Sequence, residues 1–183
     1  MIATEPLFAE WFETPLGDMV AAAADTHLHF LEFRDAATRE KTLASLQARS
    51  RRPVVCRRNR VIDQIGTELA DYFAGKSASF RTPLAPEGSD FEKNVWTELL
   101  KVPLGETCSY GDIARVVGGM ETVRAVGKAN GANPIAIVIP CHRCIGADGS
   151  LTGYGGGLWR KKWLLRHEGQ MRPIGLFALG EAQ

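Results

Sequence analysis

The chain has 183 residues, of which 45% are hydrophobic and 23% charged, so it is neither a disordered nor a fibrous protein and is long enough for one or two domains with packed cores. Lys and Arg number 22 and Asp and Glu 21, so the net charge of +1 points to no particular class of partner. No basic segment precedes an apolar stretch at the N-terminus, and no apolar run approaches the ~20 residues of a membrane span, so we expect a cytoplasmic protein with no membrane partner.

The first 75 residues predict an antiparallel sheet accompanied by helices. The expected strands are residues 8–13, 18–24 and 27–33, the first two joined by the turn Pro15-Leu16-Gly17. A short helix is expected over 36–49, and the arginine-rich segment 49–60 is either an exposed strand or a basic loop. Asn59 is expected to cap a further helix that ends at Phe73.

The segment 75–89 is rich in Ser, Pro and Gly and has no apolar periodicity, so it predicts a boundary between a supporting domain at 1–85 and a second domain at 86–183. Ser89 and Glu92 form a capping box at the start of the next helix. Two short helices follow, at 109–117 and 121–130, separated by Gly118-Gly119, and such a pair is typical of a helix-turn-helix. The predicted fold class is α+β, with a small N-terminal α/β domain containing an antiparallel sheet and a mostly helical C-terminal domain containing a helix-turn-helix.

The second of these short helices carries an unusual face. Arg124, Gly127, Lys128 and Gly131 lie three and four residues apart and therefore share one side. Glycine within a helix costs about 1 kcal/mol relative to alanine. The glycines either allow a large anionic surface to come close or let this helix pack tightly within the domain. Residues 115–166 hold eight basic and two acidic side chains, a surplus that either attracts polyanions or simply forms a solvated surface.

The chemically most suggestive segment is Pro140-Cys141-His142-Arg143-Cys144, which follows a β-branched run at 135–139 that predicts a buried strand. Positive neighbours are expected to lower the pKa of Cys141 below ~8.5 and to favour the nucleophilic thiolate. The C-x-x-C spacing has three other interpretations. A zinc site lacks a second ligand pair, haem attachment lacks a histidine directly after the second cysteine, and a thioredoxin-like redox pair stays open.

The C-terminal part of this domain predicts a pocket and a buried charge. Residues 146–157 include six glycines, which suit a loop whose backbone approaches a ligand closely. A helix over 158–168 places Glu168 in its last turn, where the helix dipole disfavours a carboxylate. We expect a histidine or an arginine to compensate this charge, with a surface lysine pair as the alternative.

Together these residues resemble a known family. Ile139-Pro140-Cys141-His142-Arg143 is similar to the acceptor motif of the O6-alkylguanine-DNA alkyltransferases, also called methylated-DNA–protein-cysteine methyltransferases. The similarity is strong over 89–169 and loose before residue 85. The further matching segments are Ser109-Tyr110, Arg124-Ala125-Val126-Gly127, Asn133-Pro134, Gly153-Tyr154 and Trp163 to Gly169, together with Thr14 to Gly17 and Tyr72 to Gly75 in the first part.

The resemblance implies DNA repair by direct reversal, in which an alkyl group moves irreversibly and once per chain from O6-alkylguanine, or from O4-alkylthymine, to Cys141. His142 would act as a base through a water molecule, Glu168 would orient it, and Tyr110 would bond the base or its phosphate. Arg124 would fill the gap left by the flipped nucleotide. No cofactor and no metal is implied, and the partner is the minor groove of double-stranded DNA, bound by a monomer.

The remaining site residues also follow from the resemblance. The implied DNA-binding residues are Arg124, Ala125, Gly127 and Lys128. The implied pocket residues are Asn133, Cys144, Tyr154, Gly155 and Gly156.

Two departures from the family pattern are visible. Valine is usual where Cys144 stands, and the C-x-x-C spacing predicts a disulfide between Cys141 and Cys144 under oxidation. Ala136 replaces a proline found in some members, which leaves the preference for bulky adducts open. Two other classes of function remain as alternatives, namely a helix-turn-helix DNA-binding regulator without chemistry and a thiol-redox protein that uses Cys141 and Cys144.

Overall fold

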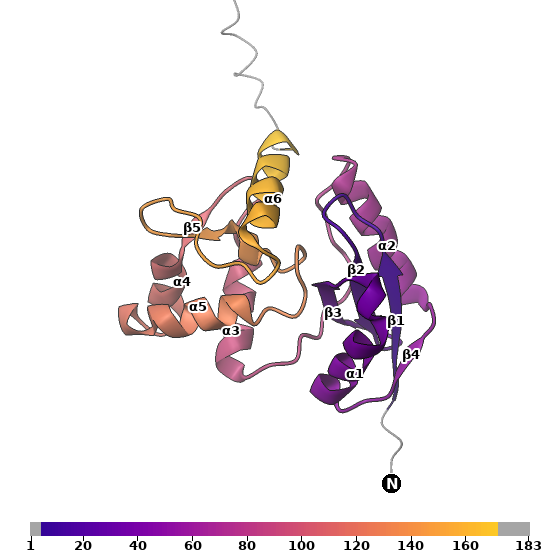
Figure 1. The fold of residues 1–183 in the computed structure, drawn as a ribbon. Helices are drawn as coiled ribbons and strands as arrows, with labels where there is room; N and C mark the ends of the chain where they lie inside the picture. Colours follow the sequence, from indigo (N-terminus) through magenta and orange to yellow (C-terminus); the bar gives the residue numbers. More distant parts are fainter. Residues whose placement is uncertain (1–4, 172–183) are drawn as a thin grey trace, which may run out of the picture.

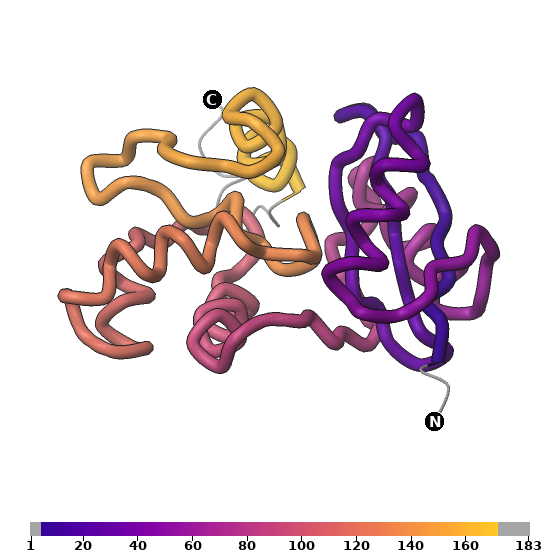
Figure 2. The backbone as a smooth tube through the Cα atoms, turned by 60° about the horizontal axis from the view of Figure 1, so that its bottom comes forward, coloured from indigo at the N-terminus to yellow at the C-terminus, as the bar shows by residue number. Residues whose placement is uncertain are grey.

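The structure, a computed structural model, describes residues 5–171 and consists of two lobes (Figure 1). The N-terminal lobe contains a four-stranded sheet and two α-helices, and the C-terminal lobe is mostly helical. Figure 2 shows the segment after α2 (Arg60–Phe73) crossing from one lobe to the other before α3 (Asp90–Leu99) begins. The predicted fold class of a small sheet-containing domain followed by a helical one is confirmed.

The sheet has the strand order β3-β2-β1-β4. Its strands are β1 (Leu7–Phe12), β2 (Met19–Ala23), β3 (Leu28–Phe33) and β4 (Val54–Cys56). The first three pair antiparallel, as their alternation predicts, and β4 lies parallel to β1 at the edge. The arginine-rich segment therefore contributes a short edge strand and not only a loop.

Helices cover both faces of this sheet, which explains why every residue of β2 is buried. On one face, Val20 and Ala22 belong to the same apolar cluster as Leu46 of α1 (Arg39–Ser50), which follows the short 3-10 helix η1 (Ala36–Thr38). On the other face, Ala21 and Ala23 pack in the main core with Ile62, Ile65 and Leu69 of α2.

Side-chain caps fix where the helices begin. Asn59 accepts a hydrogen bond from the Ile62 N–H at 2.9 Å and donates to the Ala24 carbonyl at 2.9 Å, so it caps α2 and ties that helix to the end of β2. Both halves of the capping box are present at Ser89 and Glu92, which start α3.

Three helices of the C-terminal lobe pack on one another: α3, α4 (Tyr110–Val117) and α5 (Val123–Gly131). The 3-10 helix η2 (Met120–Thr122) joins α4 to α5, and Trp96 Nε1 donates to the Ala129 carbonyl at 2.8 Å, which fixes α5 on α3. The remaining elements are the short parallel strands β5 (Cys108–Ser109) and β6 (Cys144–Ile145), the 3-10 helix η3 (Cys141–Arg143) and the helix α6 (Leu158–Met171).

The predicted strand at 135–139 is wrong. This segment is buried, as expected, but it forms turns and shares only a single bridge with Leu31 of β3. The Ile139 N–H donates back to the Ile135 carbonyl at 3.1 Å, and Ile137 has a φ of +70°, a strained value for a β-branched residue. Cys141 therefore follows a tight buried loop and opens a 3-10 turn, and it does not sit at a strand end.

The two lobes share one apolar core. Residues of β2, β3 and α2 belong to the same buried cluster as residues of α3, α4 and α5. Figure 1 shows α6 on the side of the C-terminal lobe that faces the N-terminal lobe. The division at residues 85 and 86 stays a prediction. Between residues 5 and 171, no helix is long and apolar enough to cross a membrane.

Candidate active site

Cys141 is 5% exposed and its sulfur is held by a neighbouring amide. Asn133 Nδ2 donates to Cys141 Sγ at 3.0 Å and also to the Ile139 carbonyl at 2.8 Å, while Asn133 Oδ1 accepts from the Ile135 N–H at 2.9 Å. One side chain thus closes the buried loop and positions the thiol that follows it.

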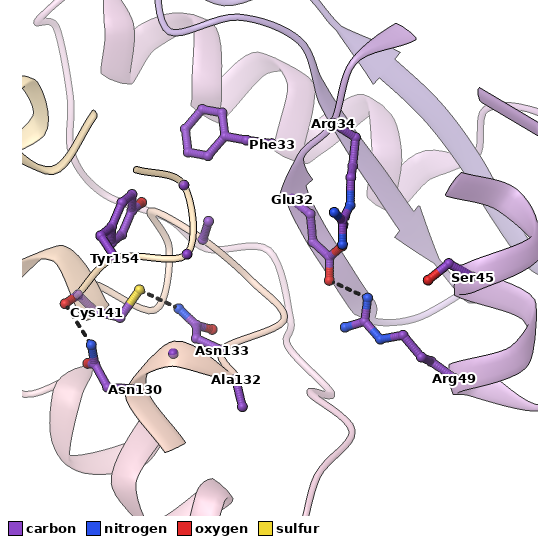
Figure 3. Close-up of a pocket in the computed structure, with 14 residues that line it drawn as sticks. Glu32, Phe33, Arg34, Ser45, Arg49, Asn130, Ala132, Asn133, Cys141 and Tyr154 are labelled. Carbon is purple, nitrogen blue, oxygen red and sulfur yellow. Dashed lines mark hydrogen bonds and ion pairs between the residues drawn. The ribbon is translucent and has the colours of Figure 1, made fainter. Parts of the chain in front are cut away.

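A cavity of about 370 Å³ opens beside Cys141 and lies between the two lobes (Figure 3). Asn133, Tyr154, Gly155 and Gly156 line it, so four of the five residues predicted for the pocket face the same space as Cys141. A Cβ added to Gly156 would stand 2.7 Å from the Tyr154 ring, so this position requires glycine unless the ring shifts.

The other side of the cavity belongs to the N-terminal lobe. Figure 3 shows Glu32, Arg34 and Arg49 across from Cys141, with Arg49 Nη1 2.7 Å from Glu32 Oε1. Cys144 and Tyr110 are not among the lining residues of this cavity. The Cys144 side chain is fully buried, and Tyr110 OH donates to the Thr152 carbonyl at 3.0 Å, where it braces the glycine-rich loop.

The expectation that positive neighbours lower the pKa of Cys141 is wrong for the free protein. Burial is the largest influence and raises the pKa of this thiol above its usual value of 9.0, while the Asn133 hydrogen bond and the charge of Lys161 lower it to a smaller extent. Cys141 is therefore a neutral thiol at pH 7, and it needs a base to become a nucleophile.

The residue after Cys141 belongs to a buried cluster around the Glu168 carboxylate. His142 Nε2 lies 2.7 Å from Glu168 Oε1, and Arg143 donates through Nε to Oε2 at 2.7 Å and through Nη2 to Oε1 at 3.0 Å. Tyr72 OH, from α2 in the other lobe, donates to Oε1 at 2.9 Å. The predicted compensation of Glu168 by histidine or arginine is realised by both.

Burial and the charge of Glu168 together determine the protonation state and the tautomer of His142. Burial opposes the Glu168 charge, but hydrogen bonds from His142 and Arg143 outweigh it and lower the pKa of Glu168 to about 2. Burial also lowers the pKa of His142 below 6.5, so the imidazole is neutral at pH 7. Because an ionised carboxylate only accepts, the proton of the neutral ring sits on Nε2. His142 Nδ1 is left with a lone pair, and it is buried with no partner among residues 5–171.

Sequence reasoning assigned no role to Tyr72 or Lys161 and treated Arg143 only as a positive neighbour of Cys141. Lys161 lies on α6 with its side chain buried, and its Nζ donates to the carbonyls of Cys144 at 2.6 Å and Thr152 at 2.8 Å. The place of Arg143 directly after the Cys-His pair is the signal that could have indicated its contact with Glu168. Tyr72 is 96 residues away from Glu168, so only the resemblance around 72–75 hinted at it.

The basic face of α5 points away from the core. Arg124, Ala125 and Lys128 are exposed, and within the described chain neither Arg124 nor Lys128 forms a hydrogen bond or an ion pair. A Cβ on Gly127 or Gly131 would meet no atom within 4 Å. Close packing inside the described structure therefore does not explain these glycines. No group of His, Cys, Asp or Glu that could hold a metal ion occurs in the described part.

Comparisons with known proteins agree with this geometry. The family model for the 6-O-methylguanine DNA methyltransferase DNA-binding domain matches residues 90–170, and the model for the ribonuclease-like domain of 6-O-methylguanine DNA methyltransferase matches residues 7–86. A methylated-DNA–protein-cysteine methyltransferase of Methanosarcina acetivorans is 40% identical over 86% of this chain and 96% of its own length. One of Mycobacterium tuberculosis is 53% identical over 60% of this chain and 66% of its own length.

Solved structures agree as well. The crystal structure of the Mycobacterium tuberculosis O6-methylguanine methyltransferase has a TM-score of 0.76 at 36% identity and covers 94% of this chain and 99% of its own. A second structure of the Mycobacterium tuberculosis protein, in complex with DNA, has a TM-score of 0.76 at 37% identity with the same coverage.

Proposed function

This chain belongs to the methylated-DNA–protein-cysteine methyltransferase family, and on that premise we propose that Cys141 is the atom that takes the alkyl group. The protein is a DNA-repair enzyme that removes methyl groups from O6-methylguanine in DNA by transferring them directly to its own cysteine. A single observation supports Cys141 most strongly. Its sulfur faces the cavity, while the next residue belongs to the buried Glu168 cluster.

The chemistry follows from that arrangement. The thiol proton moves through a water molecule to His142 Nδ1, the nitrogen of this ring that has no protein partner in the described structure. Sulfur then attacks the alkyl carbon in line, the S–C bond forms, the C–O6 bond breaks, and the electron pair stays on the guanine oxygen. Glu168 stabilises the imidazolium that results, and Arg143 and Tyr72 hold the carboxylate in place.

The product is a thioether, whose S–C bond needs a strong activating group to break. We therefore propose that each chain accepts one alkyl group, irreversibly and without a cofactor or a metal. O4-alkylthymine is a second proposed substrate, since it also presents an alkylated ring oxygen.

The DNA surface is proposed to be α4, η2 and α5, arranged as a helix-turn-helix with the exposed face of α5 in the minor groove. The target atom is not reachable in a stacked duplex, so the nucleotide must turn out of the helix at a cost of a few kcal/mol. Arg124 is exposed and free to fill the gap, and Ala125, Gly127 and Lys128 adjoin it. The flipped base is proposed to enter beside Asn133, Tyr154, Gly155 and Gly156, with Tyr110 and the backbone at Cys144 bracing the loop that holds it.

Peptide mapping tests the acceptor. Trypsin cleaves after Lys128, Arg143 and Arg160, so Cys141 and Cys144 fall in the separate peptides 129–143 and 144–160. After incubation with duplex DNA containing O6-methylguanine, the methyl group should appear on 129–143 only and should be absent in Cys141→Ser. Methylation of another peptide would overturn the assignment. Binding to undamaged DNA without any methyl uptake would favour the regulator instead, and reversible dithiol cycling alone would favour the redox protein.

Salt dependence tests the DNA surface. Each lysine that neutralises a phosphate releases counterions, so affinity should fall steeply with salt, and Lys128→Ala should reduce the slope of log K against log salt by about 1. An affinity that is indifferent to salt would contradict the role of α5. We further propose that the protein acts as a monomer, because one chain carries both the acceptor and the DNA surface, and that it acts in the cytoplasm. Sedimentation of the protein with and without a short duplex would test whether it is a monomer.

A further inference from the structure

The second cysteine of the C-x-x-C segment, Cys144, lies opposite a different cysteine from the one that the spacing suggests. β5 and β6 run parallel, and Cys108 lies directly opposite Cys144 in their register. Side chains of paired residues in adjacent strands lie on the same face of the sheet. The usual strand spacing of about 4.8 Å falls within the range of Cα separations that disulfides span, roughly 4.4–6.8 Å.

The two thiols already interact, and they differ in character. The neighbouring Cys144 thiol lowers the pKa of Cys108 against the opposing effect of burial, and the Cys108 thiol together with burial raises the pKa of Cys144. Cys108 is only partly buried, whereas Cys144 is fully buried. Cys108 is thus the thiol that ionises more readily and that an oxidant in solution can reach, and the buried Cys144 is the thiol that reacts next.

Cys141 is held apart from this pair. Its sulfur accepts the Asn133 amide hydrogen bond and faces the cavity, and Cys141 belongs to η3 while Cys144 belongs to β6. A Cys141–Cys144 disulfide would break the Asn133 contact and separate Cys144 from Cys108. The geometry therefore favours Cys108 over Cys141 as the partner of Cys144 under oxidation.

We propose that Cys108 and Cys144 form an oxidation site in which hydrogen peroxide converts the two thiols into a disulfide while Cys141 stays reduced. The Cys108 thiolate attacks peroxide, the O–O bond breaks, and Cys108 becomes a sulfenic acid as hydroxide leaves. The Cys144 sulfur then attacks the Cys108 sulfur, and the sulfenic oxygen leaves as water. Both sulfurs are oxidised, one peroxide is reduced to two waters, and a dithiol reductant reverses the change.

The consequence for the enzyme is protection of its function during oxidation. The disulfide would join the strand that precedes Tyr110 to the strand that follows η3, at a point where Lys161 already binds the Cys144 carbonyl. It leaves the acceptor sulfur and the Glu168 cluster untouched. This part rests on the proposed role of Cys141, whereas the identity of the disulfide does not.

Tryptic mapping under non-reducing conditions distinguishes the possible pairs. Peptides 102–115, 129–143 and 144–160 carry Cys108, Cys141 and Cys144 separately. A Cys56→Ser background removes the exposed cysteine on β4 that could link two chains. After limited peroxide treatment and blocking of free thiols, we expect 102–115 joined to 144–160 with the loss of two hydrogen atoms, and 129–143 recovered with a blocked thiol. A link between 129–143 and 144–160 would overturn the proposal, as would recovery of all three peptides with blocked thiols.

Activity after oxidation gives the second readout. In the oxidised protein, methyl uptake should remain at the level of the untreated protein, and a dithiol reductant should not raise it. Cys108→Ala, which retains methyl uptake before oxidation, should yield no 102–115 link and should leave Cys144 blocked. Loss of methyl uptake that a reductant restores would show that the disulfide silences the acceptor and would refute the protective role. If untreated protein takes up no methyl group, the function proposed for Cys141 fails while the mapping still decides the disulfide.

Discussion

The Glu168 cluster and the exposed face of α5 handle charge in opposite ways. Glu168 is fully buried and receives hydrogen bonds from Tyr72, His142 and Arg143, so its charge is satisfied within the chain. Arg124 and Lys128 of α5 have no partner within residues 5–171. The charge of the first region is balanced within the chain, whereas the second region is the one we propose to meet the phosphates of DNA.

The two regions also differ in whether the described structure compensates their cost in stability. A buried charge is destabilising unless it is paired, which is why each oxygen of Glu168 has a donor. Each glycine in the interior of a helix such as α5 lowers helix stability by about 1 kcal/mol relative to alanine. No contact in the described structure compensates that loss at Gly127 or Gly131. Changes in the cluster should therefore lower both stability and the rate of the chemistry, whereas changes on the exposed face of α5 should weaken DNA binding without lowering stability.

The largest expected effect comes from Glu168→Gln. Arg143 and His142 would lose the carboxylate while remaining buried, so the free energy of unfolding should fall by about 3–5 kcal/mol. Methyl transfer by the folded fraction should fall by about 100-fold or more, since the base loses its stabilising charge. Urea unfolding and single-turnover rates measure the two. Asp148→Asn removes an exposed carboxylate from the same lobe and should change stability by less than about 0.5 kcal/mol.

Arg124→Ala, in contrast, should slow transfer from duplex DNA without changing stability. Transfer from duplex DNA should slow by about 10- to 100-fold because nothing fills the gap left by the flipped nucleotide. Stability should stay within about 0.5 kcal/mol of the wild type, and transfer from the isolated O6-methylguanine base should not change. Arg81→Ala removes an exposed arginine from the other lobe as a control for net charge. Equal slowing with the isolated base would contradict a role confined to DNA.

Tyr72→Phe tests whether the N-terminal lobe takes part in the chemistry. Loss of a hydrogen bond to a charged group should destabilise the protein by about 1.5–3 kcal/mol and slow transfer by about 10-fold. The remaining negative charge on Glu168 would then act more strongly on His142, so the pKa of His142 should rise. The fall in rate on acidification should accordingly begin at a higher pH than in the wild type.

A packing control separates this role from simple destabilisation. The Phe80 ring lies 5.6 Å from the Tyr72 ring, and Phe80→Leu weakens the same part of the core without removing the hydroxyl. It should lower stability and leave the pH profile of transfer in place. If both variants have the wild-type pH profile, Tyr72 acts only as a structural residue.

The smallest effect is expected from Gly127→Ala, which should stabilise the protein. An alanine should raise the free energy of unfolding by about 0.5–1 kcal/mol, because it restricts the unfolded chain and meets no atom in the fold. It should also weaken duplex binding several-fold, since its methyl group stands between α5 and the groove. Gly169→Ala, at an equally open position on α6, should stabilise to the same degree and leave binding as it was. Undiminished DNA affinity in Gly127→Ala would disprove the close approach.

Local signals predicted local structure well. Asn59 and Ser89 begin helices where the sequence indicates, because a cap depends on residues only two or three positions away. Alternation and length indicated the first three strands for the same reason. The strand predicted at 135–139 was wrong. The composition of this segment suits a strand, but Asn133 closes it into a loop through hydrogen bonds at both ends.

Long-range features were beyond sequence reasoning. The pKa of Cys141 depends on burial more than on the adjacent His and Arg, and burial is a property of the whole fold. The partner of Cys144 is set by the pairing of two strands 36 positions apart along the chain, which no spacing rule reveals. The assignments of Cys141, His142, Glu168 and Arg124 remain predictions, which the structure supports by placing His142, the residue after Cys141, against Glu168 and by leaving Arg124 exposed.

The hydrogen bond from Tyr72 to Glu168 bears on whether the reacting half can be used by itself. A fragment beginning at Asp90 would keep the cysteine, the histidine and the DNA-facing helix, yet one donor to its central carboxylate would be gone and the apolar side of α6 that meets Phe73 would be open to water. Anyone grafting this activity onto another scaffold must therefore transplant a tyrosine from the opposite lobe as well, or supply an equivalent hydroxyl from the new host.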